Sequence, residues 1–404
     1  MSARLTIVLP LRGRPLFTLR FLWHANAARL PYRFILADGQ VLPAMAGFLE
    51  DSRKIFPNID VEYIRYPDDT DFAAYFSKMF DAMRRVQTPY AMFVDNDDFL
   101  ICSGLERSLD FLEANPDYVC CGGGIAGFSA YVRNEPALNG LVGPLNKLSF
   151  RYMPYDRSLD LSSSSATDRL LRGLRNSWSW YAVFRTPALT TIRREAAEMG
   201  LSDLQIHEKF CAMRTLTLGK ARSDSATIAY LRQYWTSLQY PFAKDWAHHL
   251  VRSHFSTDFE EVIRRISTEA ATADGVDASI VSQKLLDDIT RWFGNFLVRS
   301  YGPYAALRRY LRERVPGLLI WAKTRRRFSV PLERRKLLTK LREHGASDEY
   351  IKVFTAELAQ IEDIICGPAF ANFIGPYVPL FATDAVRKPV ATAAIPLGQI
   401  VVPD

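Results

Sequence analysis

Short apolar runs separated by amphipathic stretches dominate the first part of the chain. The runs are rich in aromatic and β-branched residues and predict strands over residues 4–11, 33–37, 60–66 and 90–94. Between them, apolar residues at helical spacing predict helices over residues 16–29, 42–55 and 71–86. Strand alternating with helix is typical of the α/β class, so we expect a doubly wound, mostly parallel, Rossmann-like sheet.

The pattern continues less regularly toward residue 231. Residues 104–114 and 187–199 have helical spacing. Residues 118–132 contain clustered glycines and predict a strand, a glycine-rich bend and a second strand. The aromatic run 177–185 and the apolar run 226–231 predict two further strands.

Strand signals fade beyond about residue 245. Helical spacing predicts segments over residues 257–272, 277–300, 303–314, 330–344 and 347–364. We therefore expect an α/β domain over 1–244, a mainly helical region over 245–374, and an irregular tail over 375–404 that is rich in proline and alanine.

Composition and charge add little to the prediction of the fold, but they limit the class of protein. The chain has 404 residues, of which 48% are hydrophobic and 24% charged, as in a globular protein with a large core. No apolar run reaches the roughly 18 residues that a membrane-spanning helix needs. The first residues have no signal-peptide pattern and the 5 cysteines lack CxxC spacing, so we expect a cytoplasmic protein without a zinc site or disulfide framework. The net charge of +7 favours anionic partners in general.

The strongest chemical signal lies at the end of the predicted strand 90–94. There Asp95-Asn96-Asp97-Asp98 places three carboxylates within four positions. Carboxylates at the mouth of a buried strand repel one another unless a cation joins them, and Mg²⁺ and Mn²⁺ prefer such oxygen ligands. The sequence therefore indicates a metal–diphosphate site at the carboxyl end of a strand. An acidic turn in which an aspartate caps the next helix is the alternative, and both stay open at this point.

Two more polar groups follow predicted strands. Arg12-Gly13-Arg14 comes after the first strand, and Asp38-Gly39 ends the second. Because parallel strands end at one edge of a sheet, we expect Arg12, Asp38 and Asp95 to lie along the same edge.

The ordered set of a Pro-x-Arg turn, a strand ending in Asp-Gly and a strand ending in Asp-x-Asp-Asp resembles inverting glycosyltransferases of the GT-A fold, close to the large family 2. The resemblance covers about residues 4–240, and its most specific element is Phe93-Val94 followed by the acidic turn. It implies an enzyme that moves a sugar from a nucleotide-sugar donor, a UDP-sugar as first guess, to a saccharide or lipid-linked acceptor. The implied setting is the synthesis of envelope polysaccharides or glycoconjugates.

The resemblance also implies a role for individual residues. Pro10, Arg12 and Arg14 would lie along the nucleotide, and Asp38 would bind its base. Asp95 would contact the ribose or the metal, and Asp97 would bind Mn²⁺ or Mg²⁺ on the diphosphate. Asp98 would assist the metal or hold the loop, and Arg232 would contact the diphosphate.

The catalytic base is less clearly marked. The family usually carries it in an acidic pair at the start of a helix, and this chain has Asp203 and Glu208 there instead. Glu208 is the preferred base, because Asp203 is well placed as a helix N-cap.

Some interpretations of the sequence compete. The stretch 308–342 is strongly basic, which fits either a solvated helical face or peripheral contact with the anionic inner surface of a membrane. No nucleic-acid-binding motif accompanies the charge, so no nucleic acid is expected as a partner. For the whole chain, the competing functions are a nucleotide-sugar-binding scaffold without turnover and a sugar nucleotidyltransferase.

Overall fold

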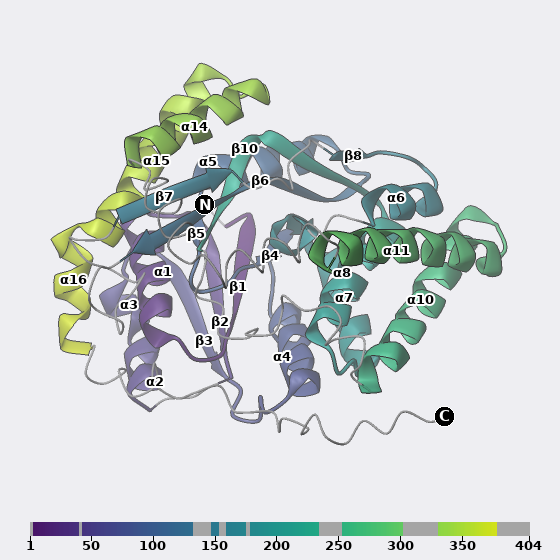
Figure 1. The fold of residues 1–404 in the computed structure, drawn as a ribbon. Helices are drawn as coiled ribbons and strands as arrows, with labels where there is room; N and C mark the ends of the chain where they lie inside the picture. Colours follow the sequence, from purple (N-terminus) through teal and green to yellow (C-terminus); the bar gives the residue numbers. More distant parts are fainter. Residues whose placement is uncertain are drawn as a thin grey trace, which may run out of the picture.

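The computed structural model describes residues 3–39, 43–131, 147–152, 159–174, 178–233, 253–301 and 330–377. Within these ranges, one long sheet crosses the molecule and helices pack on both of its faces (Figure 1). The fold is of the α/β class with a helical C-terminal region, as the sequence predicts.

The sheet has the strand order β3-β2-β1-β4-β9-β6-β10-β5. These strands are β1 (Leu5–Leu11), β2 (Arg33–Asp38), β3 (Asp60–Arg65), β4 (Tyr90–Phe93), β5 (Phe99–Leu100), β6 (Tyr118–Tyr131), β9 (Val183–Arg185) and β10 (Lys220–Gln233). Two more strands, β7 (Lys147–Tyr152) and β8 (Leu159–Leu161), pair with β6 and β10. The half β3-β2-β1-β4 is parallel throughout. Beyond β4 the sheet is mixed, because the short β9 runs antiparallel to both of its neighbours while β6 and β10 are parallel to each other.

Strand β1 shows why the first half of the sheet forms. Its residues are buried on both faces, with Ile7 in one hydrophobic core and Val8 in the other. Strands covered on both faces have continuous apolar sequences, in agreement with the apolar run that predicts this strand.

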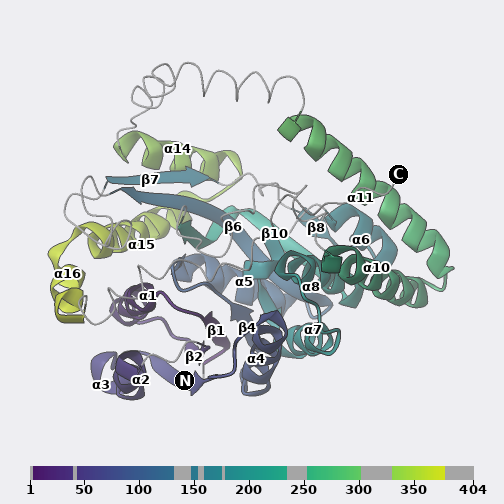
Figure 2. The same ribbon diagram turned by 60° about the horizontal axis from the view of Figure 1, so that its bottom comes forward.

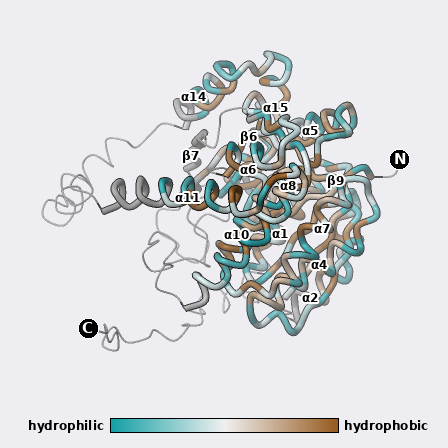
Figure 3. The backbone as a smooth tube through the Cα atoms, turned by 90° about the vertical axis from the view of Figure 1, so that its right-hand side faces the viewer, coloured by the Kyte–Doolittle hydropathy of each residue, from teal (hydrophilic) through white to brown (hydrophobic). Residues whose placement is uncertain are grey.

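Two layers of helices enclose the sheet. One core contains residues from α1 (Pro15–Ala27), α2 (Pro43–Glu50), α3 (Ser52–Ile55) and α5 (Cys102–Ala114). The other contains residues from α4 (Phe72–Arg84), α6 (Ala166–Gly173), α7 (Thr186–Glu198) and α8 (Leu204–Leu218). Along α4 and α7, hydrophobic and hydrophilic residues alternate, as expected of helices with one buried face (Figure 3).

The late helices join these two cores in separate groups. Helices α10 (Ser253–Asp274) and α11 (Ala278–Tyr301) contribute to the core of α7 and α8. Helices α14 (Val330–Glu343), α15 (Asp348–Cys366) and α16 (Pro368–Ile374), with the 3₁₀ turn η3 (Gly375–Tyr377), pack against the core of α1 and α5. Figure 1 shows the two groups on opposite sides of the molecule, and Figure 2 shows them from a second direction. The division at residue 245 stays a prediction, and the expected helix 303–314 lies outside the described residues. Among the helices that are described, none has both the length and the apolar character to cross a membrane.

Two local predictions are wrong. Residues 118–131 form the single strand β6 rather than two strands around a bend, and residues 178–181 form the 3₁₀ turn η2 (Trp178–Tyr181) before the short β9. The glycines of β6 serve close packing against β10: a Cβ on Gly123 would lie 2.8 Å from the backbone nitrogen of Ala229. The glycine-rich sequence therefore reflects the neighbouring strand, which the local pattern does not contain.

Strand β10 is irregular where it faces these glycines, and a side chain of α15 forms hydrogen bonds with its backbone there. The register between β10 and β6 shifts on both sides of Ile228. The hydroxyl of Tyr350, from α15, accepts a hydrogen bond from the Ile228 nitrogen at 2.7 Å and donates one to the Ile228 carbonyl at 3.1 Å. The backbone groups that the bulge removes from the ladder are thus satisfied by a side chain from the C-terminal region.

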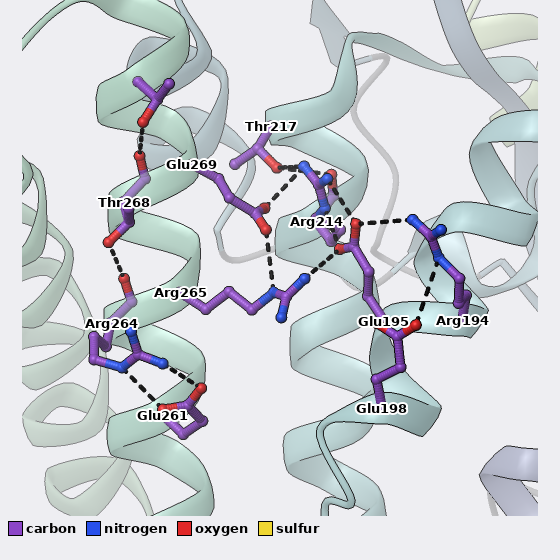
Figure 4. A network of polar contacts seen from close by, with 11 residues as sticks. Arg194, Glu195, Glu198, Arg214, Thr217, Glu261, Arg264, Arg265, Thr268 and Glu269 are labelled. Atoms are coloured by element: carbon purple, nitrogen blue, oxygen red, sulfur yellow. Dashed lines mark hydrogen bonds and ion pairs between the residues drawn. The ribbon is translucent and has the colours of Figure 1, made fainter.

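A network of ion pairs fixes α10 on α7 and α8 (Figure 4). Both oxygens of the buried Glu195 accept from Arg214, at 2.7 and 3.0 Å. Arg214 also lies 2.8 Å from Glu269 of α10, and Arg265 of α10 lies 3.5 Å from Glu195. Glu195 therefore sits where all three helices meet.

We expect Glu195→Ala to lower the free energy of unfolding by about 2 to 3 kcal/mol. The mostly buried Arg214 would lose one of its two carboxylate partners and keep only Glu269. The matched control is Glu261→Ala, whose partner Arg264 is exposed on the outside of α10, and a change within about 0.5 kcal/mol is expected. Urea denaturation followed by circular dichroism measures both. Equal losses in the two variants would contradict this role for Glu195.

Candidate functional site

The acidic turn follows β4 at the carboxyl end of the parallel strands. The Val94 nitrogen still donates to the Val8 carbonyl of β1, at 3.1 Å, and the chain then leaves the sheet. Carboxylate oxygens of Asp95, Asp97 and Asp98 all lie within 4.8 Å of one another. Such a set of hard oxygen ligands fits Mg²⁺ or Mn²⁺.

Asp98 does not cap the following helix. Its carboxylate accepts from the Tyr230 hydroxyl at 2.5 Å and from the Gln233 backbone nitrogen at 2.6 Å, while α5 begins only at Cys102. The capping alternative is therefore wrong, and Asp98 instead joins the acidic turn to the end of β10.

Two stacked tyrosines, Tyr181 and Tyr230, form hydrogen bonds with the acidic turn. The Tyr230 hydroxyl, which donates to Asp98, also accepts from the Asp95 nitrogen at 3.1 Å. The Tyr181 hydroxyl donates to Asp95 Oδ2 at 3.0 Å, and its ring stacks on that of Tyr230 with centroids 4.2 Å apart. The Arg232 guanidinium lies 5.6 Å from the Tyr181 ring centroid, which brings a positive charge to the same place.

Burial and mutual repulsion raise the pKa of two of these carboxyls. The pKa of Asp95 is raised above its ordinary value first by burial and then by the charge of Asp97. The pKa of Asp98 is raised further, by the same two causes and by Asp95. A cation placed among the three carboxylates would reverse the repulsive part of both shifts.

Helix α1 and the residue before it also contact the acidic turn. Arg14 Nη1 forms an ion pair with Asp97 Oδ2 at 2.5 Å. The fully buried Arg20 donates to the Asp97 backbone carbonyl at 2.5 Å and also to the Gln233 side chain. Arg14 was predicted as a site residue from the sequence, whereas the pairing with Asp97 was not.

The other predicted residues lie along the same sheet edge. Pro10 pairs with Ala37 near the end of β1, and Asp38 ends β2. The Asp38 carboxylate is buried and accepts from the Tyr63 hydroxyl at 2.9 Å. Arg12 is exposed and donates to the Thr70 carbonyl at 3.2 Å. The expected alignment of strand ends is thus observed, while the roles of these residues stay predictions.

The two candidate bases have different surroundings. Asp203 is the residue before α8, and its Oδ1 accepts from the Ile206 nitrogen at 3.1 Å, so it caps that helix. Glu208 is half-buried in the second turn of α8. Burial, and then the nearby charge of Asp95, raise the pKa of Glu208 to about 7, while Arg232 opposes the shift. A carboxyl with this pKa can accept a proton near neutral pH.

A small pocket beside Glu208 contains an arginine that the sequence did not reveal. Arg193 of α7 is buried, with its guanidinium 4.3 Å from the ring centroid of Phe93 and 4.6 Å from that of Trp180. The pocket is lined by Ser179, Trp180, Phe184, Leu189, Ile192, Arg193, Glu208, Cys211, Ala212 and Thr215. Arg193 thus places a positive charge near Glu208 and lowers its pKa somewhat.

The sequence does not predict the contacts that Tyr181, Tyr230 and Arg193 make at the site. Tyr181 and Tyr230 lie in aromatic stretches that the sequence does mark, but their contacts join positions 86 and 132 residues apart. Arg193 lies on an ordinary amphipathic helix with no motif around it.

No family model matches the chain, and no curated protein does. Among solved structures, S. aureus TarS 1–349 is similar with a TM-score of 0.44 and 12% identity, covering 92% of each chain. The same TarS fragment in complex with UDP-GlcNAc gives a TM-score of 0.45 at 11% identity, and in complex with UDP 0.43 at 12%, each again over 92% of both chains. Similarity at this level leaves the function to be argued from the residues of this chain.

We expect Tyr230→Phe to lower the free energy of unfolding by about 1 to 3 kcal/mol, because it leaves a buried carboxylate oxygen and the Asp95 N–H without their partner. Tyr66→Phe is the control, since it removes a half-buried hydroxyl that bonds Asp81 near the surface, and we expect a loss below about 1 kcal/mol. Thermal and urea denaturation compare the two. A Tyr230→Phe variant as stable as Tyr66→Phe would show that the tyrosine does not hold the turn.

Proposed function

We propose that this chain is an inverting, metal-dependent glycosyltransferase that uses a nucleotide-sugar donor, a UDP-sugar in the first instance. The acceptor would be a saccharide or a lipid-linked saccharide in envelope polysaccharide or glycoconjugate synthesis. The observation that carries the proposal is the acidic turn, in which three carboxylates lie within 4.8 Å of one another at the end of a parallel strand. Glu208 lies close enough for the charge of Asp95 to raise its pKa.

On the donor side, the chain offers charges of both signs. A bound Mn²⁺ or Mg²⁺, held by Asp97 and Asp95, would neutralise the diphosphate as it leaves. Arg14 and Arg232 lie beside the same carboxylates and add positive charge for the phosphates. Asp38, buried at the end of β2, would accept a hydrogen bond from the base.

On the acceptor side, Glu208 would serve as the general base. As the acceptor oxygen forms its bond to the anomeric carbon, the bond from that carbon to the diphosphate oxygen breaks. The hydroxyl proton passes to the Glu208 carboxylate, and the nucleoside diphosphate leaves with the bonding electrons. A single displacement of this kind inverts the configuration and needs only one base. Asp203, whose carboxylate caps α8, would act through the position of that helix.

Three outcomes of one assay separate this function from its alternatives. The protein is incubated with labelled sugar nucleotides and Mn²⁺. Transfer or slow hydrolysis supports the glycosyltransferase. Binding without turnover would indicate a nucleotide-sugar-binding scaffold, and release of pyrophosphate from a nucleoside triphosphate and a sugar phosphate would indicate a nucleotidyltransferase.

Further proposals rest on the sequence alone. We propose that residues 1–244 form the glycosyltransferase domain, residues 245–374 a helical domain and residues 375–404 a tail. The basic stretch 308–342 would allow peripheral contact with the inner face of a membrane from a cytoplasmic location. No nucleic acid is proposed as a partner.

We expect Asp97→Ala to abolish metal-dependent nucleotide binding while the fold persists. The residue lies in a turn after the strand, and removing its charge relieves repulsion with Asp95 and Asp98, which offsets part of the loss of the ion pair with Arg14. Calorimetry with UDP, with and without Mn²⁺, measures the effect, and circular dichroism checks the fold. Equal affinity of the variant and the wild type for UDP in the presence of Mn²⁺ would remove Asp97 from the metal site.

We expect Glu208→Gln to reduce the transfer rate by about 10²- to 10⁴-fold, the usual contribution of a general base. In the wild type, the rate should fall about tenfold per pH unit below pH 7, since only the ionised carboxylate accepts a proton. Asp203→Asn should have a mild effect, because asparagine also caps helices well. A dead Asp203→Asn together with an active Glu208→Gln would exchange the two roles.

Stability provides the control for Glu208→Gln. A carboxyl whose pKa rises on folding stabilises the folded state while protonated, and this stabilisation is lost as the pH increases toward 7. The glutamine variant should therefore be at least as stable as the wild type at pH 8, with the difference closing at pH 4 to 5. A lower melting temperature at pH 8 would mean that the loss of rate reflects unfolding.

A further inference from the structure

The backbone of the basic turn has an unusual conformation. Gly13 and Arg14 both have positive φ angles, of 73° and 55°, and Arg14 lies in the left-handed helical region immediately before α1. This region is unfavourable for a residue with a Cβ and is found mostly where the surrounding structure enforces it.

The acidic turn itself holds this conformation. The side-chain amide of Asn96 donates to the Thr18 hydroxyl at 2.9 Å, to the Arg14 carbonyl at 3.3 Å and to the Gly13 carbonyl at 3.4 Å. Asn96 stands between Asp95 and Asp97 in the sequence. The basic turn and the acidic turn are therefore one hydrogen-bonded unit.

As a result, the guanidinium of Arg14 contacts the acidic cluster directly. Arg14 Nη1 lies 2.5 Å from Asp97 Oδ2, and the two side chains are only 17% and 9% exposed. Arg20 donates a hydrogen bond to the Asp97 backbone carbonyl at 2.5 Å. With Arg14 and Arg232 beside three carboxylates, little net negative charge remains to attract a further cation.

We propose that Arg14 is the resident counter-cation of the acidic turn, and that a divalent cation competes with it for Asp97. Tight binding of the cation then requires that the guanidinium moves to another anion, and the diphosphate of the donor is the partner that matches its planar pair of N–H donors. This inference rests on the proposed function.

Coupled binding is the measurable consequence. If the diphosphate releases Asp97 from Arg14, the nucleotide must strengthen cation binding and the cation must strengthen nucleotide binding by the same factor. The wild-type protein should bind Mn²⁺ weakly alone and more tightly, by roughly 5- to 150-fold, when UDP is present.

The experiment measures Mn²⁺ binding by electron paramagnetic resonance and calorimetry, with and without UDP. Arg14→Gln should bind Mn²⁺ alone more tightly than the wild type by a similar factor, about 5- to 150-fold, and UDP should then add less than it adds in the wild type, because only the direct attraction between cation and diphosphate remains. Its melting temperature should be lower than that of the wild type without metal and should recover with Mn²⁺. The matched control is Arg12→Gln, which removes the same charge two residues away from a guanidinium that bonds the Thr70 carbonyl. It should leave the affinity for Mn²⁺ alone unchanged.

The outcomes distinguish this inference from the proposed function. Equal affinity of the wild type and Arg14→Gln for Mn²⁺, with binding still lost in Asp97→Ala, would overturn the inference and leave the metal site standing. Equal tightening in Arg12→Gln would also overturn it, since the effect would then be one of general charge. No Mn²⁺ binding by any variant, with or without UDP, would overturn the metal site and the inference with it. If Arg14→Gln does not fold, Arg14→Met decides: it keeps an apolar stem without the charge and should bind Mn²⁺ alone more tightly than the wild type, whereas equal affinity would overturn the inference.

Discussion

Repulsion among three neighbouring carboxylates, two of them buried, is the constraint on which the centre of this structure depends. Asp95, Asp97 and Asp98 lie within 4.8 Å of one another at the end of β4, and burial makes each charge more costly. Strand β4 cannot balance these negative charges, because it contains no charged residue. The balancing groups must therefore come from other elements, and the packing of those elements determines the geometry of the turn.

Two elements provide this balance. Helix α1 contributes Arg14 and Arg20, and the end of β10 contributes the Tyr230 hydroxyl and the Gln233 nitrogen. These contacts join residues that are 77 to 135 positions apart in the sequence. The parallel strands carry the acidic turn to the edge of the sheet, while the mixed half returns β10 to the same place.

Local patterns explain which features could be predicted from the sequence. The parallel strands and their helices follow from apolar runs and helical spacing within each segment, and the acidic turn is visible as a motif. The long strand β6 was missed because its glycines are explained by Ala229 on another strand. Likewise, nothing near Tyr181 in the sequence indicates that its hydroxyl bonds Asp95. Contacts between distant segments thus determine the details that a local pattern leaves open.

The contact between Tyr350 and the bulge of β10 has a consequence for the order in which the protein assembles. During synthesis the strands of the sheet leave the ribosome before α15, and chains generally begin to fold from their N-terminal part. Until Tyr350 arrives, the backbone of Ile228 lacks its partners, only two residues before the tyrosine that holds Asp98. We therefore expect β10 next to the acidic turn to be completed only when the C-terminal helices dock. A nascent chain that ends before α15 would contain the three carboxylates and the groups that contact them, but the strand that carries Tyr230 would lack the contact with Tyr350.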